Sequence, residues 1–263
     1  MYKKGSKSDP ANYRPVSLLS LVSKVMEKYI AYHIVRHLEV NDIFSKRQFG
    51  FRSGHSTLHP LLITHQLAAD VLDKQMEARA VALDIAGAFD TVWHKRLLQK
   101  AEAAGLRGQL YVWLENYLSN RVQVVAVDGV MSDALDIQAG VPQGSILGPI
   151  MFLLYINDLP AVTKSLPLFF ADDSTLVQVA KSTSHRLTCW QTLQNDLEAV
   201  MEWSHLNQLK FAPHKTQSLL ISAKKDKQAP LAHKPLSLEH VNIEEVQSLK
   251  LLGDSFSSKG RAL

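Results

Sequence analysis

The chain has 263 residues, 46% of them hydrophobic and 21% charged, which is an ordinary soluble composition with enough chain for one large domain or two small ones. Its 29 basic and 25 acidic residues leave a net charge of +4, which permits a nucleic-acid partner without indicating one. The single cysteine, Cys189, excludes an internal disulfide and a zinc site built from cysteine pairs.

Hydrophobic periodicity predicts helices in the first half of the chain at residues 17–40, 56–77, 91–106 and 109–120. The third of these helices should end at Gly105, because glycine readily takes the left-handed conformation that closes a helix. Residues 79–89 predict an apolar strand. Residues 121–140 predict a hairpin that turns at Asp128-Gly129.

The second half of the chain predicts a buried helix with a proline inside it at 144–160 and an amphipathic helix at 187–209. Strands are expected in a hairpin at 166–180 and in two further segments, 211–222 and 249–258. The polar segment 223–235 predicts an exposed connection. Helices and strands therefore interleave without strict βαβ alternation, which favours an α+β fold.

The cellular location also follows from composition. A lone cysteine is typical of an intracellular protein. No apolar run reaches the roughly 18 residues of a membrane span, and no apolar segment follows the basic N-terminus as it would in a secretory signal. We therefore expect an intracellular protein with no membrane partner.

The hairpin at 166–180 carries two adjacent carboxylates, Asp172 and Asp173, at its tip. Neighbouring carboxylates repel each other unless a cation or a proton lies between them. A third acid, Asp84, ends the predicted strand; alone it would more often be a helix cap, a role that suits Asp90 before the helix expected to start at Thr91. Together, Asp84 and the adjacent pair predict a site for two Mg²⁺ ions, which prefer carboxylate and phosphate oxygens.

A loop rich in glycine and proline, "AGVPQGS" at 139–145, lies between these acids in the sequence. One interpretation is a turn that leads into a core helix. The other is a backbone that a base pair can approach closely, since glycine leaves room and proline fixes the chain.

Three segments in this order resemble the palm motifs of reverse transcriptases, namely "ALDIAGAFDTVWH" (82–94), "VPQGSILGPIMFLLYINDL" (141–159) and "FFADDSTLV" (169–177). Four flanking segments resemble the family's fingers motifs, the motif after the active site and the primer grip: "KKGSKSDPANYRPVSLLSLVSKVMEKYI" (3–30), "FSKRQFGFRSGHST" (44–57), "WSHLNQLKFAPHKTQSLLIS" (203–222) and "LKLLGDSFSS" (249–258). The resemblance covers nearly the whole chain. It is greatest to the non-LTR, LINE-type retrotransposons of the jockey or CR1 sort.

The resemblance implies the fingers and palm of a right-hand polymerase, with a ferredoxin-like antiparallel palm sheet. The fingers would be residues 1–78, and the palm with a fingers-side insertion would be 79–222. The connection and primer grip would be 223–263. The first motif begins at the start of the chain and the primer grip lies near its end, so we expect a domain truncated at both ends, without a thumb.

The resemblance also assigns catalytic roles. The match implies that Asp84, Asp172 and Asp173 bind two Mg²⁺ ions, with Mn²⁺ as an alternative, and that Lys215 protonates the pyrophosphate leaving group.

Further matching positions imply contacts with the nucleotide and the primer. Phe89 matches the aromatic gate that excludes a 2′-hydroxyl. Gln143 and Gly144 match the amide and the tight backbone beside the incoming nucleotide. The phosphate-binding fingers positions are Lys4, Arg14 and Arg52, and the primer-grip positions are Leu251, Leu252 and Gly253. The chain departs from the family at Asp254, where valine or isoleucine is usual.

The motif order therefore predicts an RNA-directed DNA polymerase that extends a DNA primer with dNTPs on an RNA template, in the nucleus or in a cytoplasmic ribonucleoprotein. The alternative is a catalytically inactive retroelement remnant that only binds RNA or an RNA–DNA duplex, which a missing thumb favours. A viral RNA-dependent RNA polymerase is disfavoured, because such enzymes usually carry a small polar residue at the position of Phe89 and glycine at that of Ala171.

Overall fold

The computed structural model describes residues 2, 5–6, 8–9, 12–13, 16–127, 129–223 and 235–259. Lys4, Arg14, the turn residue Asp128 and most of the expected connection at 223–235 lie outside the described residues. The chain forms two compact units. Unit 1 contains residues 1–44 and 89–155, and unit 2 contains residues 45–88 and 156–263.

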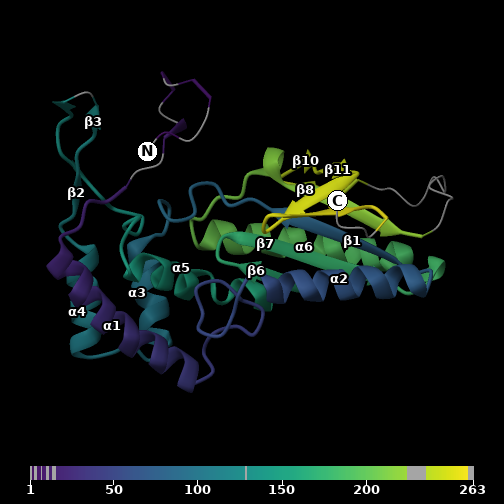
Figure 1. Cartoon of the computed structure of the whole chain (residues 1–263), viewed down its shortest axis with the longest axis horizontal. Helices are drawn as coiled ribbons and strands as arrows, with labels where there is room; N and C mark the ends of the chain where they lie inside the picture. The colour runs from purple at the N-terminus through teal and green to yellow at the C-terminus, as the bar shows by residue number, and fades with distance from the viewer. Residues whose placement is uncertain are drawn as a thin grey trace. The chain divides into compact units, whose positions relative to one another are not determined.

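Unit 2 is built on a five-stranded sheet (Figure 1). Its strands lie in the order β11 (Glu244–Val246), β8 (Gln217–Ser222), β1 (Glu77–Leu83), β7 (Asp173–Ala180) and β6 (Leu166–Phe170). Neighbours from β8 to β6 are antiparallel, and β11 adds to β8 in parallel. The expected α+β class is confirmed, and the sheet as a whole is mixed.

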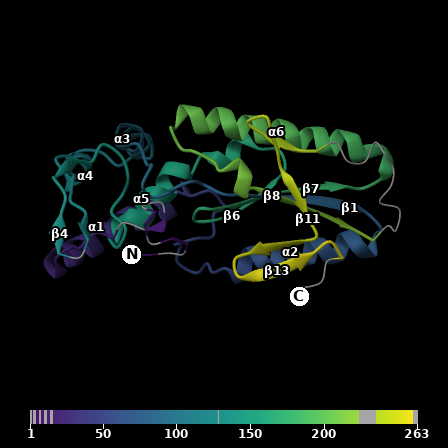
Figure 2. The same cartoon turned by 90° about the horizontal axis from the view of Figure 1, so that it is seen from above.

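Two helices cover opposite faces of this sheet, α2 (Leu58–Asp73) on one side and α6 (Arg186–Leu206) on the other (Figure 2). Alternation along β1 explains the two faces, because successive strand residues point to opposite sides. Ala78 and Ala80 pack with α2 in an apolar cluster, whereas Glu77 pairs with Arg186 of α6.

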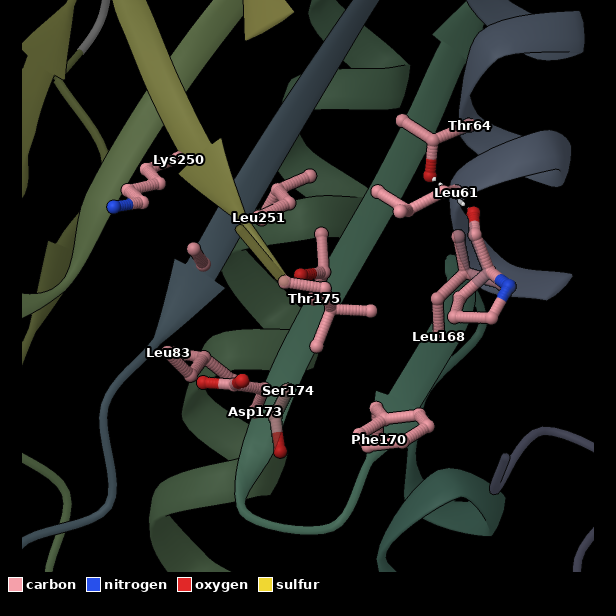
Figure 3. Close-up of a pocket in the computed structure, with 13 residues that line it drawn as sticks. Leu61, Thr64, Leu83, Leu168, Phe170, Asp173, Ser174, Thr175, Lys250 and Leu251 are labelled. Carbon is pink, nitrogen blue, oxygen red and sulfur yellow. Dashed lines mark hydrogen bonds between the residues drawn. The ribbon is translucent and has the colours of Figure 1, made fainter. Parts of the chain in front are cut away.

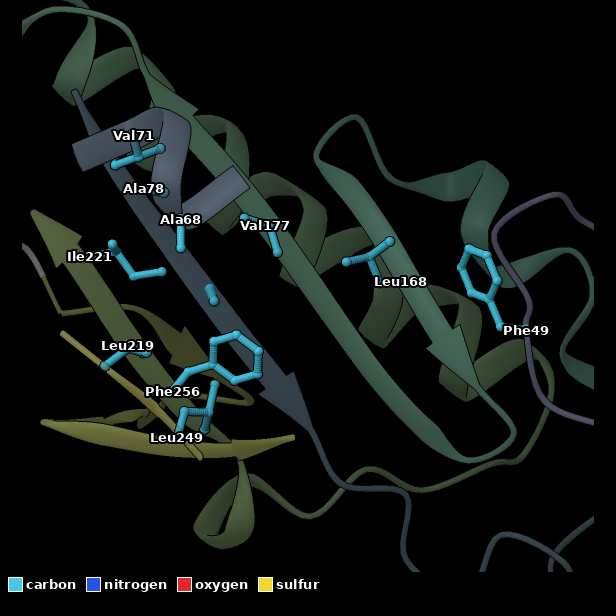
Figure 4. Close-up of a cluster of buried hydrophobic side chains, with 11 residues drawn as sticks. Phe49, Ala68, Val71, Ala78, Leu168, Val177, Leu219, Ile221, Leu249 and Phe256 are labelled. Atoms are coloured by element: carbon cyan, nitrogen blue, oxygen red, sulfur yellow. The ribbon is translucent and has the colours of Figure 1, made fainter. Parts of the chain in front are cut away.

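The apolar cluster holds α2 and a second hairpin against the sheet (Figure 4). It contains the buried residues Phe49, Ala68, Val71, Ala78, Ala80, Leu168, Val177, Leu219, Ile221, Leu249 and Phe256. Leu249 and Phe256 come from the hairpin of β12 (Ser248–Leu251) and β13 (Asp254–Ser257). Its two turn residues, Leu252 and Gly253, have φ of 51° and 92°, as the tightest hairpin turns require. A further short pair joins β9 (Ser237–Leu238) to β10 (Val241–Asn242).

Unit 1 is mainly helical, with α1 (Leu21–Val40), α3 (His94–Ala103), α4 (Gln109–Leu118) and α5 (Leu147–Ile156) around an apolar core. The predicted hairpin at 121–140 is present as two strand pairs. They are β2 (Val122–Gln123) with β5 (Leu135–Asp136), and β3 (Ala126–Val127) with β4 (Val130–Met131). Among the described residues, no helix has both the length and the apolar character that a membrane crossing needs.

Three of the predicted helices start three or more residues later than expected: α1 at Leu21 instead of residue 17, α5 at Leu147 instead of 144, and α3 at His94 instead of Thr91. The helix expected from Thr91 begins at His94, and Trp93 occupies its N-cap position. The side chain of Asp90 therefore caps no helix; its Oδ1 accepts a hydrogen bond from Gln143 Nε2 at 2.7 Å. The other end of the helix was predicted correctly, since Gly105 follows it with a φ of 83°.

Candidate active site

Two of the three predicted metal-binding aspartates are brought together by strand register in unit 2. Leu83 at the end of β1 pairs with Ser174 of β7, so Asp84, which follows Leu83, lies beside Asp173, the first residue of β7. Asp172 adjoins Asp173 in the turn between β6 and β7. The sheet therefore gathers the three carboxylates at one end, although 88 residues separate Asp84 from Asp172 in the sequence (172 minus 84).

The pKa of Asp173 is raised in this environment. Desolvation of its carboxyl raises the pKa of Asp173, and the charges of Asp172 and then Asp84 raise that pKa further. A divalent cation between these groups would remove the repulsion and favour the ionised form.

The donor set has the chemistry of a Mg²⁺ site, since all three side chains are carboxylates. Within the described residues, no three His, Cys, Asp or Glu side chains converge closely enough to hold a metal ion on their own. Mg²⁺ is usually bound by one or two carboxylates with phosphate and water oxygens in the remaining positions. Asp84, Asp172 and Asp173 supply carboxylate oxygens of the kind that Mg²⁺ prefers.

Lys215 lies beside the aspartates. Its Nζ is 3.5 Å from Asp84 Oδ1; the Lys215 side chain is largely exposed, and that of Asp84 is partly buried. The segment that carries Lys215 is attached to the end of β1, because the amide of Ala212 donates to the carbonyl of Asp84 at 2.8 Å. A short 3₁₀ turn, Pro213–Lys215, then directs the lysine back toward Asp84.

The predicted nucleotide-binding residues Phe89, Gln143 and Gly144 belong to unit 1, where two paired segments hold them. The amide of Val141 donates to the carbonyl of Phe89 at 2.7 Å, and the amide of Gly140 donates to that of Val92 at 2.8 Å. The Phe89 ring lies 4.8 Å from the ring of buried Phe152.

Glycines shape this loop. A Cβ on Gly140 would lie 2.9 Å from the carbonyl oxygen of Asp90, so only glycine fits without movement of the backbone. Gly144 has a φ of 101° and is exposed, which leaves its backbone open to a ligand.

A buried acid that the sequence did not single out supports the same loop. Glu27 of α1 is 1% exposed, and its Oε2 accepts hydrogen bonds from the amides of Ile146 at 2.7 Å and Leu147 at 3.3 Å. Its Oε1 accepts from the hydroxyl of Tyr117 at 3.1 Å. Burial, followed by smaller effects that include Glu27, raises the pKa of Tyr117 to about 12. Glu27 therefore caps the N-terminus of α5, directly after Gln143 and Gly144.

Arg52, predicted to bind phosphate, lies in unit 2, where its guanidinium donates to the carbonyls of Ser45 at 2.9 Å and Gln48 at 3.3 Å. These hydrogen bonds stabilise the loop from Ser45 to Arg52. Its role toward phosphate remains a prediction.

The predicted primer-grip residues Leu251 and Leu252 line a cavity of about 60 Å³ in unit 2, and Figure 3 shows Leu251 there. Gly253 is exposed at the hairpin turn. The cavity is enclosed by α2, the β6–β7 hairpin and β12, and Asp173 also lines it. The β12–β13 hairpin and Asp173 therefore line the same small cavity in unit 2.

An ion pair explains the departure at Asp254. Its Oδ2 lies 2.9 Å from Nε2 of His65 on α2, and the His65 ring also lies 4.4 Å from the ring of Phe256. The hydrogen bond from His65, followed by one from the amide of Ser255, lowers the pKa of Asp254. The acid at this position therefore attaches the β12–β13 hairpin to α2.

The His65–Asp254 pair predicts a pH-dependent stability. Because the pKa of Asp254 is lower in the folded protein than in the unfolded chain, the pair should stabilise the fold above the ordinary aspartate pKa and cease to do so as the pH falls through the lowered value. Asp254→Asn should therefore lower the free energy of unfolding at pH 6, and the difference from wild type should shrink at pH 3. Urea unfolding at both values measures this, with Asp73→Asn as control. A difference that grows at pH 3 would contradict the account.

Comparisons with known proteins show the fold and the family of the chain. A solved structure of apo telomerase from Candida tropicalis, truncated from its C-terminal domain, matches with a TM-score of 0.59 at 11% identity, covering 90% of this chain and 44% of that one. This likeness shows a shared fold. A family model described as reverse transcriptase (RNA-dependent DNA polymerase) matches residues 2–255, and the chain belongs to this family.

Proteins related in sequence indicate which kind of reverse transcriptase the chain resembles. The chain is 32% identical over 253 residues to the probable RNA-directed DNA polymerase from transposon X-element of Drosophila melanogaster, covering 93% of this chain and 26% of that protein. It is 35% identical over 205 residues to the RNA-directed DNA polymerase from mobile element jockey of the same species, covering 75% and 22%. The chain thus resembles the reverse transcriptase domain of non-LTR retrotransposons and spans about a quarter of the length of these relatives.

Proposed function

We propose that the chain catalyses RNA-directed DNA synthesis, in which dNTPs extend a DNA primer on an RNA template. The observation that carries this proposal is the gathering of Asp84, Asp172 and Asp173 at one end of the unit 2 sheet, in a chain of the reverse transcriptase family. The relatives are named as RNA-directed DNA polymerases, and the comparisons do not favour the alternative of an inactive remnant.

In this proposal the unit 2 strands β8, β1, β7 and β6, together with α6, form the palm of a right-hand polymerase, and α2 belongs to the fingers. Residues 1–78 supply the fingers, 79–222 the palm with its insertion, and 223–263 the connection and primer grip. The nucleic-acid partners are an RNA template and a DNA primer, and the site of action is the nucleus or a cytoplasmic ribonucleoprotein. A telomerase from Candida tropicalis with a TM-score of 0.60 was solved with a fragment of telomeric RNA, which supports a nucleic-acid partner.

The aspartates would hold two Mg²⁺ ions, or Mn²⁺ in their place. Such ions, when bound, stabilise the charge that develops on the attacking and leaving oxygens of phosphoryl transfer. Desolvation, and then repulsion from Asp172 and Asp84, raises the pKa of Asp173, and three such exposed or half-buried carboxylates are a suitable donor set for cations. Lys215, with its Nζ 3.5 Å from Asp84 Oδ1, would give a proton to the departing pyrophosphate.

The remaining site residues would bind the nucleotide and the primer. Gln143 and Gly144 would border the base, and Arg52, Lys4 and Arg14 would bind phosphates. The backbone of Leu251, Leu252 and Gly253 would hold the primer end.

Phe89 is proposed to select deoxyribonucleotides, because an aromatic ring under the sugar leaves no room for a 2′-hydroxyl. Phe89→Ala should therefore raise the ratio of rNTP to dNTP incorporation about tenfold or more. Single-nucleotide extension with CTP and dCTP measures this ratio. Phe89→Leu, which keeps part of the bulk, should give a smaller increase, and a ratio unchanged in both variants would remove Phe89 from sugar selection.

The proposed function is tested by extension of a DNA primer annealed to an RNA of mixed sequence, with four dNTPs and Mg²⁺. The expected product is DNA complementary to the RNA, as read by sequencing. Products that form only with rNTPs, or that do not follow the template, would contradict the proposal.

A further inference from the structure

A buried amide lies behind the turn that carries Asp172 and Asp173. Gln48 is 2% exposed, and its Oε1 accepts hydrogen bonds from the amide of Ala171 at 2.9 Å and from the amide of Gly50 at 2.8 Å. Its Nε2 faces the carbonyl of Ala171 at 3.4 Å. One side chain therefore contacts both backbone polar groups of the residue that precedes the two aspartates.

The segment that carries Gln48 is bound to the edge strand of the sheet. The amide of Phe49 donates to the carbonyl of Phe169 at 2.8 Å, and the amide of Phe169 donates to the carbonyl of Arg47 at 2.9 Å. The Phe49 side chain is buried in the unit 2 apolar cluster. This bridge pairs with β6 at the edge of the sheet, where unpaired backbone groups would otherwise be exposed. It also fixes the position of Gln48.

The turn needs such support, because Ala171 has a φ of 56°. A residue with a Cβ adopts this left-handed conformation at a cost, and it persists only where the surroundings impose it. The backbone of Gly50 packs tightly against this turn, since a Cβ on Gly50 would lie 2.3 Å from the amide nitrogen of Ala171. Gln48 and Gly50 together hold the strained backbone immediately before Asp172.

We propose that Gln48 is a positioning residue that fixes the β6–β7 turn so that Asp172 and Asp173 present their carboxylates in one geometry toward a divalent cation. The inference deepens the proposed function and rests on it for the catalytic consequence alone. Gln48 touches neither the cation nor the substrate; it acts through the backbone of Ala171. Loss of its two accepted hydrogen bonds would leave buried amides unpaired and release the turn.

The test uses three variants of the whole chain. Gln48→Leu removes the acceptor. If the leucine variant does not fold, Gln48→Met, which also lacks the acceptor, is used in its place. Gln48→Glu keeps an oxygen at the same place. The matched control is Asp196→Asn, because Asp196 is 2% exposed and likewise accepts two backbone hydrogen bonds, from Lys164 and Ser165, but at the opposite end of β6.

Two readouts do not depend on synthesis. Hydrogen exchange reports the protection of the Ala171 amide, and paramagnetic resonance with Mn²⁺ alone reports cation affinity. We expect Gln48→Leu to lose at least about tenfold in protection and to bind Mn²⁺ more weakly, while Gln48→Glu retains the protection. Asp196→Asn should lose stability without either change. In primer extension, kcat of Gln48→Leu should fall at least about tenfold with KM for dTTP nearly constant, since a small displacement of catalytic groups has this effect.

Mn²⁺ affinity equal to that of wild type in Gln48→Leu would overturn the inference, as would Ala171 protection no lower than in the Asp196→Asn control. An unchanged kcat in an active protein would also overturn it. If the wild-type chain extends no primer, the proposed function fails, but the exchange and Mn²⁺ measurements still decide the role of Gln48.

Discussion

Asp172→Asn should lower the rate of primer extension at least about 1,000-fold, because losing a metal ligand removes several kcal/mol of charge stabilisation from the transition state. The free energy of unfolding should change by less than about 0.5 kcal/mol, since Asp172 is exposed in a turn. Its removal also relieves part of the repulsion that raises the pKa of Asp173. The initial rate of dTTP incorporation and a urea unfolding curve measure the two effects.

Asp73→Asn is the matched control for Asp172→Asn, because Asp73 is also an exposed aspartate. It is the last residue of α2 and is not one of the proposed site residues. It should retain the wild-type rate. A rate of Asp172→Asn within about tenfold of wild type would show that this carboxylate is not an essential metal ligand.

Glu27→Leu should lower the free energy of unfolding by about 3 kcal/mol, the largest stability effect that we expect. The substitution leaves the buried amide of Leu147, the amide of Ile146 and the Tyr117 hydroxyl without their shared acceptor. It also removes a carboxyl group from the positive end of α5. Thermal unfolding should show a midpoint about 6–12 °C lower in the transition that includes unit 1.

Glu102→Leu on α3 controls for the loss of a glutamate, since Glu102 is exposed. It should change the free energy of unfolding by less than about 0.5 kcal/mol. Equal effects of the two substitutions would mean that Glu27 does not cap α5.

Most of the fold could be predicted from patterns among residues that are close together in the sequence. Helical periodicity in α1 and α6 and the apolar flanks of Asp172 and Asp173 are properties of adjacent residues, so they can be read from the sequence. Gly105 and Gly129 were recognised because turns and helix ends require particular residues. The aspartates could be grouped in advance through the order of their motifs.

The residues that support the site could not be predicted in this way. Gln48 is 123 residues from Ala171, and Glu27 is 119 residues from Ile146. A buried glutamine or glutamate has no local signal of its partner, because its acceptors are satisfied only once the strands and helices are assembled. His65 and Asp254 are a similar case, since the pair explains a departure from the family pattern only after α2 and the β12–β13 hairpin are placed.

The error at Asp90 arose because long-range pairing competes with a local preference. An aspartate before an apolar, helix-like run is typical of an N-cap, but β1 ends at Leu83 and the chain remains irregular until Trp93. The bridge between Trp93 and Ala139 occupies this stretch, and it places Asp90 beside Gln143 instead. Long-range pairing therefore outweighed the capping preference.

The central claim is that these aspartates catalyse DNA synthesis on RNA, and one measurement tests it most directly. Wild type and Asp172→Asn are compared for incorporation of dTTP into oligo(dT) annealed to poly(rA), with Mg²⁺ and with duplex binding measured alongside. We predict extension by the wild type and none by the variant, with equal duplex binding. Equal extension by both proteins, or duplex binding by a wild type that extends nothing, would contradict it.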